Sequence, residues 1–155
     1  MQIYDILKQK AIEDKIYSLV LGGVIVNDGK ILLIKRADNQ FMKNLYEFPS
    51  GKLEFGETFE QCLKRHIKEE LNCKVKDVEG YAGHFDYLSD KGQLVRQYNF
   101  VLNLENLNDI SLSTEHTNYG FFRASDCNDL IDISDEILYT MDIVTSNRVL
   151  CKEVK

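Results

Sequence analysis

Apolar residues recur along this chain with two different spacings. Near the N-terminus they lie at positions 3, 6, 7 and 11, which is the spacing of a helix. Residues 17–26 and 31–35 are instead rich in branched apolar side chains, and Asn27-Asp28-Gly29-Lys30 between them is typical of a tight turn. The pattern predicts a helix over 3–12 and then a β-hairpin.

The same criteria place further elements along the rest of the chain. They predict a long helix over 58–72, strands over 75–84, 95–104 and 120–123, and a closing helix over 137–150. Strands that are interrupted by one helix and followed by another favour an α/β fold, with a mixed sheet packed between helices. No repeat or linker divides the chain, so we expect one domain over residues 1–155.

Composition and charge narrow the possible partners. The apolar and charged fractions, 44% and 28%, are those of a globular protein. The longest apolar run is far shorter than the ~18 residues that span a bilayer, and the first residues lack the pattern of a signal peptide, so we expect a cytoplasmic protein without membrane contact. A net charge of −6 argues against a polymeric nucleic-acid partner but permits a small phosphorylated ligand. The N-terminal helix could help build a homodimer.

The helix over 58–72 places one carboxylate among apolar side chains. At 100° per residue, its apolar arc consists of Phe59, Leu63, Ile67 and Leu71. Glu70 falls inside this arc, whereas Glu69 lies further round. A carboxylate on the buried side of a helix is costly unless a cation pairs with it. A bound metal would do so; the alternative is an ordinary solvated acidic pair.

The spacing around these carboxylates resembles a known motif. The chain has a glycine, then five residues, a glutamate, seven residues and an arginine, at Gly51, Glu57, Arg65, Ile67, Glu69 and Glu70. This resembles the Nudix box, G-x5-E-x7-R-E-U-x-E-E-x-G-U, in which U is bulky and apolar. His66 stands in place of a box glutamate and Asn72 in place of the glycine. The resemblance implies a Nudix-type α/β/α sandwich.

The resemblance also implies a chemistry. Nudix proteins typically hydrolyse the pyrophosphate link of a nucleoside diphosphate derivative with Mg²⁺ or Mn²⁺. By position, Glu69 and Glu70 are the expected metal ligands, together with the Ser50 carbonyl. Arg65 and Glu57 would orient them. Glu115 is the candidate general base and a further ligand, although it could equally be a solvated loop carboxylate.

His66 leaves a second function open. Histidine does not replace glutamate as a hard anionic ligand, and loss of a general base typically costs about 10²–10⁴ in rate. A Nudix-fold binding or regulatory module is therefore the alternative to a hydrolase. An isomerase of the isopentenyl-diphosphate type lacks a convincing cysteine–glutamate pair here.

Other residues are candidates for contact with the substrate. Two arginines could meet phosphates and three aromatic residues could stack on a base or sugar: Arg36, Arg96, Tyr46, Phe48 and Phe122. Surface ion pairs and core packing are the respective alternatives. We expect His84 and His116 to be structural or solvated.

Overall fold

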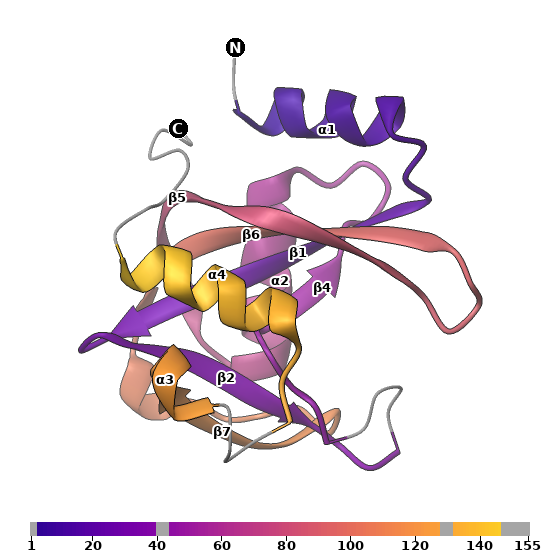
Figure 1. Ribbon diagram of the computed structural model, residues 1–155. Helices are drawn as coiled ribbons and strands as arrows, with labels where there is room; N and C mark the ends of the chain where they lie inside the picture. The colour runs from indigo at the N-terminus through magenta and orange to yellow at the C-terminus, as the bar shows by residue number, and fades with distance from the viewer. Residues whose placement is uncertain (1–2, 40–43, 128–131, 147–155) are drawn as a thin grey trace.

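A mixed β-sheet lies between helices in the computed structural model, which describes residues 3–39, 44–127 and 132–146 (Figure 1). The elements, in chain order, are α1 (Ile3–Glu13), β1 (Ser18–Asn27), β2 (Lys30–Arg36), β3 (Tyr46–Glu47), β4 (Ser50–Lys52), α2 (Phe59–Leu71), β5 (Lys74–Leu88), β6 (Leu94–Glu105), η1 (Leu107–Asp109), β7 (His116–Phe122), α3 (Ala124–Cys127) and α4 (Asp135–Thr145). No helix in these ranges is long and apolar enough to cross a membrane.

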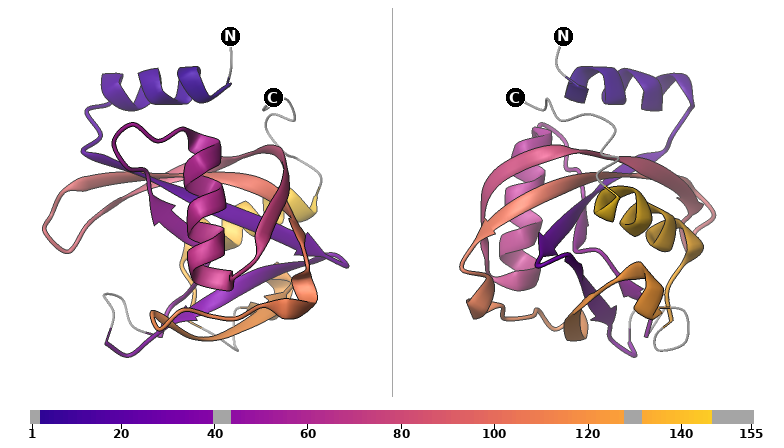
Figure 2. Two further views of the ribbon diagram at one scale, coloured as in Figure 1. Left: turned by 180° about the vertical axis from the view of Figure 1, so that it is seen from behind. Right: turned by 60° about the vertical axis from the view of Figure 1, so that its left-hand side comes forward.

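Strand β1 is the centre of the sheet. The strand order is β3-β2-β1-β6-β5, with β4 paired to β1 and β7 paired to β2. β1 and β6 run parallel, whereas the other pairs are antiparallel. Helices α2 and α4 cover opposite sides of this sheet (Figure 2). The predicted α/β fold, with a mixed sheet between helices, is therefore confirmed.

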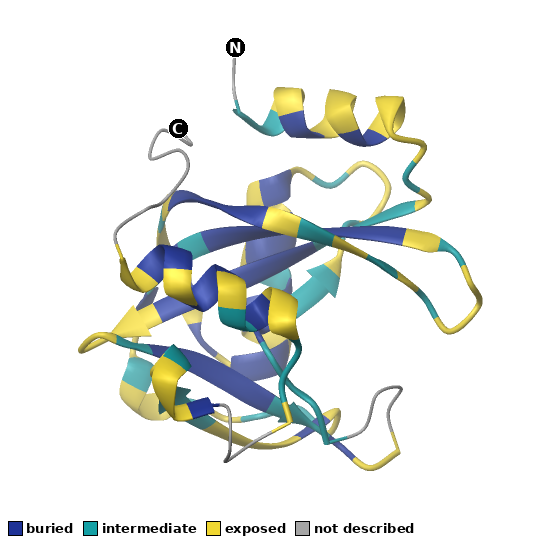
Figure 3. Cartoon of the chain, in the orientation of Figure 1, coloured by how far each residue is buried: buried dark blue, intermediate teal, exposed yellow. Residues whose placement is uncertain are grey.

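Alternation along the strands divides the core into two clusters. On β2, Leu32 and Ile34 pack in the cluster that contains the apolar face of α2, and Ile31 and Leu33 pack in the cluster that contains α4. Successive strand side chains point to opposite faces, so a run of apolar residues serves both clusters. The buried residues accordingly gather on the central strands and on the inner faces of the helices (Figure 3).

Local signals fix both ends of α2. Thr58 is the N-cap, and its hydroxyl accepts from the Gln61 backbone N–H at 3.1 Å while the Gln61 side chain accepts from the Thr58 N–H at 2.9 Å. At the other end Asn72 adopts a left-handed conformation with φ of 55°. Asparagine tolerates this conformation better than most residues, which explains how it replaces the expected glycine.

The predicted elements are present, but several bounds differ. Strand β7 begins at His116, four residues before the predicted start at 120, and β5 continues to Leu88 rather than ending at 84. The short elements β3, β4 and α3 were not predicted, because two to four residues carry too little periodicity to detect. Residues 147–150 of the predicted closing helix lie outside the described residues.

Arg96 joins three segments rather than lining a cavity. Its Nε donates to Asp86 Oδ1 at 2.7 Å, and its Nη1 donates to Asp14 Oδ2 at 2.8 Å. The side chain is only 6% exposed. We had considered Arg96 for phosphate binding. In the structure it instead links β6 to β5 and to the end of α1.

We expect Arg96→Gln to lower the free energy of unfolding by about 1–3 kcal/mol at neutral pH, because it removes charged hydrogen bonds from a buried position. The Arg96 guanidinium holds the pKa of Asp86 below its ordinary 3.8. The stabilisation is therefore present above that value and is lost as the pH falls through the lower folded-state pKa. Denaturant unfolding should show the deficit shrinking below about pH 4. Exposed Lys76→Gln is the control; a pH-independent deficit would contradict the assignment.

Candidate functional site

A polar cavity of about 250 Å³ lies where α2 meets β3, β4 and the start of β7. Its walls contain five glutamates, two arginines, one lysine and two histidines. The lining residues are Arg36, Glu47, Ser50, Gly51, Lys52, Glu54, Arg65, His66, Glu69, Glu70, Glu115 and His116. The predicted site residues Glu69, Glu70, Ser50, Arg65, Glu115 and Arg36 are thus brought together. Glu57 adjoins the cavity through Arg65.

Glu70 is the most deeply placed of these carboxylates. Its Oε1 accepts from the Ser50 backbone N–H at 2.8 Å, a contact that β4 makes possible by pairing with β1. The residue is 8% exposed. Burial, and then the negative charge of Glu47, raise the pKa of Glu70 to about 9, against the opposing hydrogen bond from Ser50. No lysine or arginine forms an ion pair with it among the described residues.

Arg65 organises the entrance to the helix. Its Nε and Nη2 donate to the two oxygens of Glu57 at 2.7 and 3.0 Å, and Nη2 also donates to the Lys52 carbonyl at 2.8 Å. These hydrogen bonds lower the pKa of Glu57 to about 2. Glu69 pairs more loosely with Arg65, at 3.4 Å, and its side chain is 60% exposed. Glu69 therefore faces the open side of the cavity and Glu70 the closed side.

His66 is buried against Gly51. A Cβ on residue 51 would stand 2.6 Å from the Cβ of His66, so this position requires glycine. Burial, reinforced by the charge of Arg65, lowers the pKa of His66 to about 3, so the ring is neutral. The Leu21 backbone opposes this shift, although neither ring nitrogen has a partner with good hydrogen-bond geometry among the described residues. The residue that departs from the Nudix box is thus a neutral imidazole at the back of the cavity.

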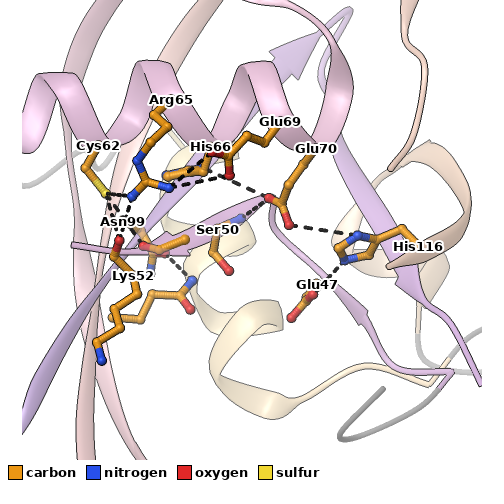
Figure 4. Close-up of polar contacts among 12 residues, drawn as sticks. Glu47, Ser50, Lys52, Cys62, Arg65, His66, Glu69, Glu70, Asn99 and His116 are labelled. Atoms are coloured by element: carbon orange, nitrogen blue, oxygen red, sulfur yellow. Dashed lines mark hydrogen bonds and ion pairs between the residues drawn. The ribbon is translucent and has the colours of Figure 1, made fainter. Parts of the chain in front are cut away.

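Glu47 and His116 belong to the site, although we did not predict them there. His116 Nε2 and Glu47 Oε2 lie 2.9 Å apart (Figure 4), and Arg36 Nη1 donates to the same Glu47 oxygen at 2.9 Å. His116 was expected to be structural or solvated, but it is buried and lines the cavity. The available signal was a carboxylate between Tyr46 and Phe48, whose alternation indicates a strand with one polar face.

Glu115 is held close to α2 by its loop. The Ser111 and Ser113 backbone N–H groups donate to the carbonyls of Leu71 and Glu70 at 2.9 and 3.2 Å. The side chain of Glu115 itself is exposed and lines the cavity. The main chain therefore places this carboxylate opposite Glu70 while leaving it free to contact water.

A second cavity, of about 620 Å³, adjoins the first. The two share the wall Arg36, Glu47, Ser50, Gly51 and Lys52. The larger one is mainly apolar, and its other walls come from the ends of β5 and β6 and the start of α4, including Phe85, Tyr87 and Ile137. A polar chamber thus opens into a larger, less polar one.

The aromatic residues proposed for stacking lie elsewhere. Phe48 is fully buried, and the Tyr46 and Phe122 rings pack edge to face at 5.5 Å. All three belong to the core cluster that contains α4 and line neither cavity. The larger cavity is instead lined by two other aromatic residues, Phe85 and Tyr87, which we did not predict.

The polar cavity fits a divalent cation by charge and donor type. Carboxylates crowd around Glu70, which is buried and forms no ion pair with a described lysine or arginine. Hard oxygen donors are those that Mg²⁺ and Mn²⁺ prefer. Glu69, Glu70, Glu115 and the Ser50 carbonyl could supply such oxygens. In the described part of the chain, however, no three acidic, histidine or cysteine side chains are already grouped closely enough to hold an ion.

Comparison with known proteins places the chain in one family. Residues 18–138 match the family model of the NUDIX domain. The chain is 45% identical over 65 residues to an ADP-ribose pyrophosphatase of Methanocaldococcus jannaschii, covering 41% of this chain and 38% of that protein. It is 41% identical over 76 residues to an 8-oxo-dGTP diphosphatase of Haemophilus influenzae, covering 48% and 56% respectively. The chain thus aligns with roughly half, or less, of each of these relatives.

A solved structure extends the likeness in fold over most of the chain. The crystal structure of a MutT protein from Methanosarcina mazei superposes with a TM-score of 0.73 at 18% identity, covering 86% of this chain and 95% of that one. At this identity the match supports the arrangement of the sheet and helices.

We expect Gly51→Ala to lower the free energy of unfolding by about 1–3 kcal/mol, because the new methyl group would overlap the backbone-proximal atoms of His66. Denaturant unfolding would measure the loss, and the His66 ring resonances in NMR spectra should shift. Ser50→Ala, the neighbouring substitution without such an overlap, is the matched control. Equal stability of the two variants would show that His66 does not press on residue 51.

Proposed function

Because this chain belongs to the NUDIX-domain family, we propose that it hydrolyses the pyrophosphate link of a small nucleoside diphosphate derivative with Mg²⁺ or Mn²⁺. The observation that carries this proposal is Glu70, a carboxylate buried among other carboxylates at the back of a polar cavity. Such a group is stable as an anion only beside a cation. The proposal treats residues 1–155 as one domain.

In this proposal Glu70, Glu69 and the Ser50 carbonyl hold the cation. When bound, the ion would offset charge on the phosphate oxygens and acidify a water molecule. The Ser50 N–H keeps Glu70 turned toward the cavity, at 2.8 Å. Arg65 keeps Glu57 and the Lys52 carbonyl in place, so that the chain before α2 has one conformation.

The two adjoining cavities suit the two halves of such a substrate. Arg36 and Lys52 lie in the shared wall, where they can bind phosphate oxygens. Arg36 is already oriented by Glu47, and its buried Nε has no hydrogen-bond partner among the described residues. Phe85 and Tyr87 in the larger cavity can contact the base or sugar. The pyrophosphate would then sit at the junction, next to Glu70.

Glu115 is our candidate for the general base. It would take a proton from the attacking water as the oxygen of that water forms a bond to one phosphorus. The bridging P–O bond breaks, and the leaving phosphate departs with the bridging oxygen. The exposed Glu115 side chain can reach solvent water and pass the proton to it, while main-chain hydrogen bonds hold its loop beside α2.

His66 keeps a second candidate function in view. A neutral imidazole stands where the Nudix box has a carboxylate, which weakens the site for hard cations. A ligand-binding or regulatory module would use the same two cavities without turnover. The relatives named above point to ADP-ribose and oxidised nucleotides as the first ligands to test for either function. The cytoplasmic location and the homodimer stay predictions.

We expect Glu70→Gln to reduce metal-dependent hydrolysis by about 10²-fold or more, because the amide keeps the hydrogen bond to Ser50 but loses the negative charge. The measurement is the formation of nucleoside monophosphate, followed by chromatography, from a panel that includes ADP-ribose, 8-oxo-dGTP and CTP, with Mg²⁺, with Mn²⁺ and with a chelator. Exposed Glu60→Gln on the same helix is the control. Absence of turnover across the panel, with ligand binding retained, would replace the hydrolase by the binding module.

We expect Glu115→Gln to lower kcat by about 10²–10⁴ and to leave KM nearly unchanged, since a general base acts on the water rather than on substrate affinity. Steady-state kinetics on the best substrate of the panel would measure both constants. Glu105→Gln, an exposed glutamate at the end of β6, is the matched control. A rise in KM at constant kcat would instead assign Glu115 to substrate binding.

A further inference from the structure

Three buried imidazole nitrogens beside Glu70 have no hydrogen-bond partner among the described residues: both nitrogens of His66, and Nδ1 of His116. Two of these atoms approach the same carboxylate. His66 Nδ1 lies 3.9 Å from Glu70 Oε1, and His116 Nδ1 lies 3.8 Å from Glu70 Oε2 (Figure 4). Unpaired buried polar atoms are rare and call for a missing partner. Here the partner must lie between two imidazoles and a carboxylate.

His116 is oriented as a metal-binding histidine is. Glu47 is ion-paired to Arg36 and, as a carboxylate, only accepts hydrogen bonds, so His116 Nε2 carries a proton and donates it to Glu47 at 2.9 Å. The other ring nitrogen, Nδ1, then faces the Glu70 carboxylate, 3.8 Å from its Oε2. A carboxylate that holds one ring nitrogen, so that the other can bind a cation, is the usual support of a metal-binding histidine.

His66 is fixed in place mainly by packing. It is 1% exposed, and its ring lies directly against the Gly51 backbone. The ring therefore has little freedom to turn away from Glu70. The two rings thus lie on either side of Glu70 (Figure 4), one held by Gly51 and one by Glu47, and the three side chains must draw together before they can hold an ion.

We propose that His66, His116 and Glu70 form a mixed nitrogen–oxygen donor set that binds Co²⁺ or Zn²⁺ in preference to Mg²⁺. Imidazole suits these ions, whereas Mg²⁺ prefers oxygen donors alone. Adjacent ligands with bonds of ~2.1 Å lie about 3 Å apart, so gaps of 3.8 and 3.9 Å require a closure of less than about 1 Å. The inference rests on the proposed function in placing a cation beside Glu70.

The test measures metal binding without substrate. Calorimetry gives the affinities of the full chain for Co²⁺ and Mg²⁺, and proton NMR of the Co²⁺-loaded protein detects the shifted, exchangeable N–H of a bound imidazole. His116→Gln keeps a donor for Glu47 but removes Nδ1, and His66→Glu exchanges nitrogen for a hard oxygen. Exposed His84→Gln changes the third histidine of the chain, which lies on β5. Circular dichroism of the metal-free variants checks the fold.

We expect tighter binding of Co²⁺ than of Mg²⁺ by the wild type, with a shifted imidazole resonance. His116→Gln should weaken Co²⁺ binding about tenfold or more with little effect on Mg²⁺, and His66→Glu should strengthen Mg²⁺ binding. His84→Gln should change neither. Equal affinities in the wild type, or equal losses for both ions in His116→Gln, would overturn the inference.

The outcomes separate this inference from the proposed function. Mg²⁺-dependent turnover without any imidazole resonance overturns the mixed donor set and leaves the hydrolase. Imidazole-bound Co²⁺ without turnover on any member of the substrate panel overturns the hydrolase and leaves the donor set. If one variant fails to fold, the other still tests the ligation by histidine, because His66 and His116 lie on different elements.

Discussion

The burial of the Glu70 carboxylate on the core side of α2 is the constraint on which the site depends. An ion in this position is costly, and the hydrogen bond from Ser50 offsets only part of the cost, since the pKa of Glu70 stays raised to about 9. Strand β4 supplies the Ser50 N–H, β7 supplies His116, and the helix itself supplies His66 one turn earlier. The pairing of β4 with β1 and of β7 with β2 is therefore what turns a helical carboxylate into a site.

Features that depend on local spacing could be predicted from the sequence. The apolar arc of α2 and the position of Glu70 inside it follow from the period of a helix, and the structure buries both. The first hairpin follows from its branched strands and its turn residues. The contact between Arg65 and Glu57, eight residues apart, could also be predicted, because both residues lie near the start of the same helix.

Features that depend on strand register could not be predicted. Glu47 and His116 are 69 residues apart, and they meet because β2 pairs with β3 on one side and with β7 on the other. Periodicity predicts that a strand exists but does not name its neighbour. The same limit explains Arg96, whose partner Asp14 is 82 residues away. Phe48 shows a different limit, since an aromatic residue beside a site can equally serve the core.

The wall shared by the two cavities separates two tasks of the site. Arg36, Glu47, Ser50, Gly51 and Lys52 come from β2, β3 and β4, and Ser50 and Lys52 are hydrogen-bonded to α2 through their main chains. The other walls of the larger cavity come from β1, β5, β6, α4 and the segments beside them. Substitutions confined to the outer walls would therefore change what the larger cavity recognises without touching the carboxylates around Glu70.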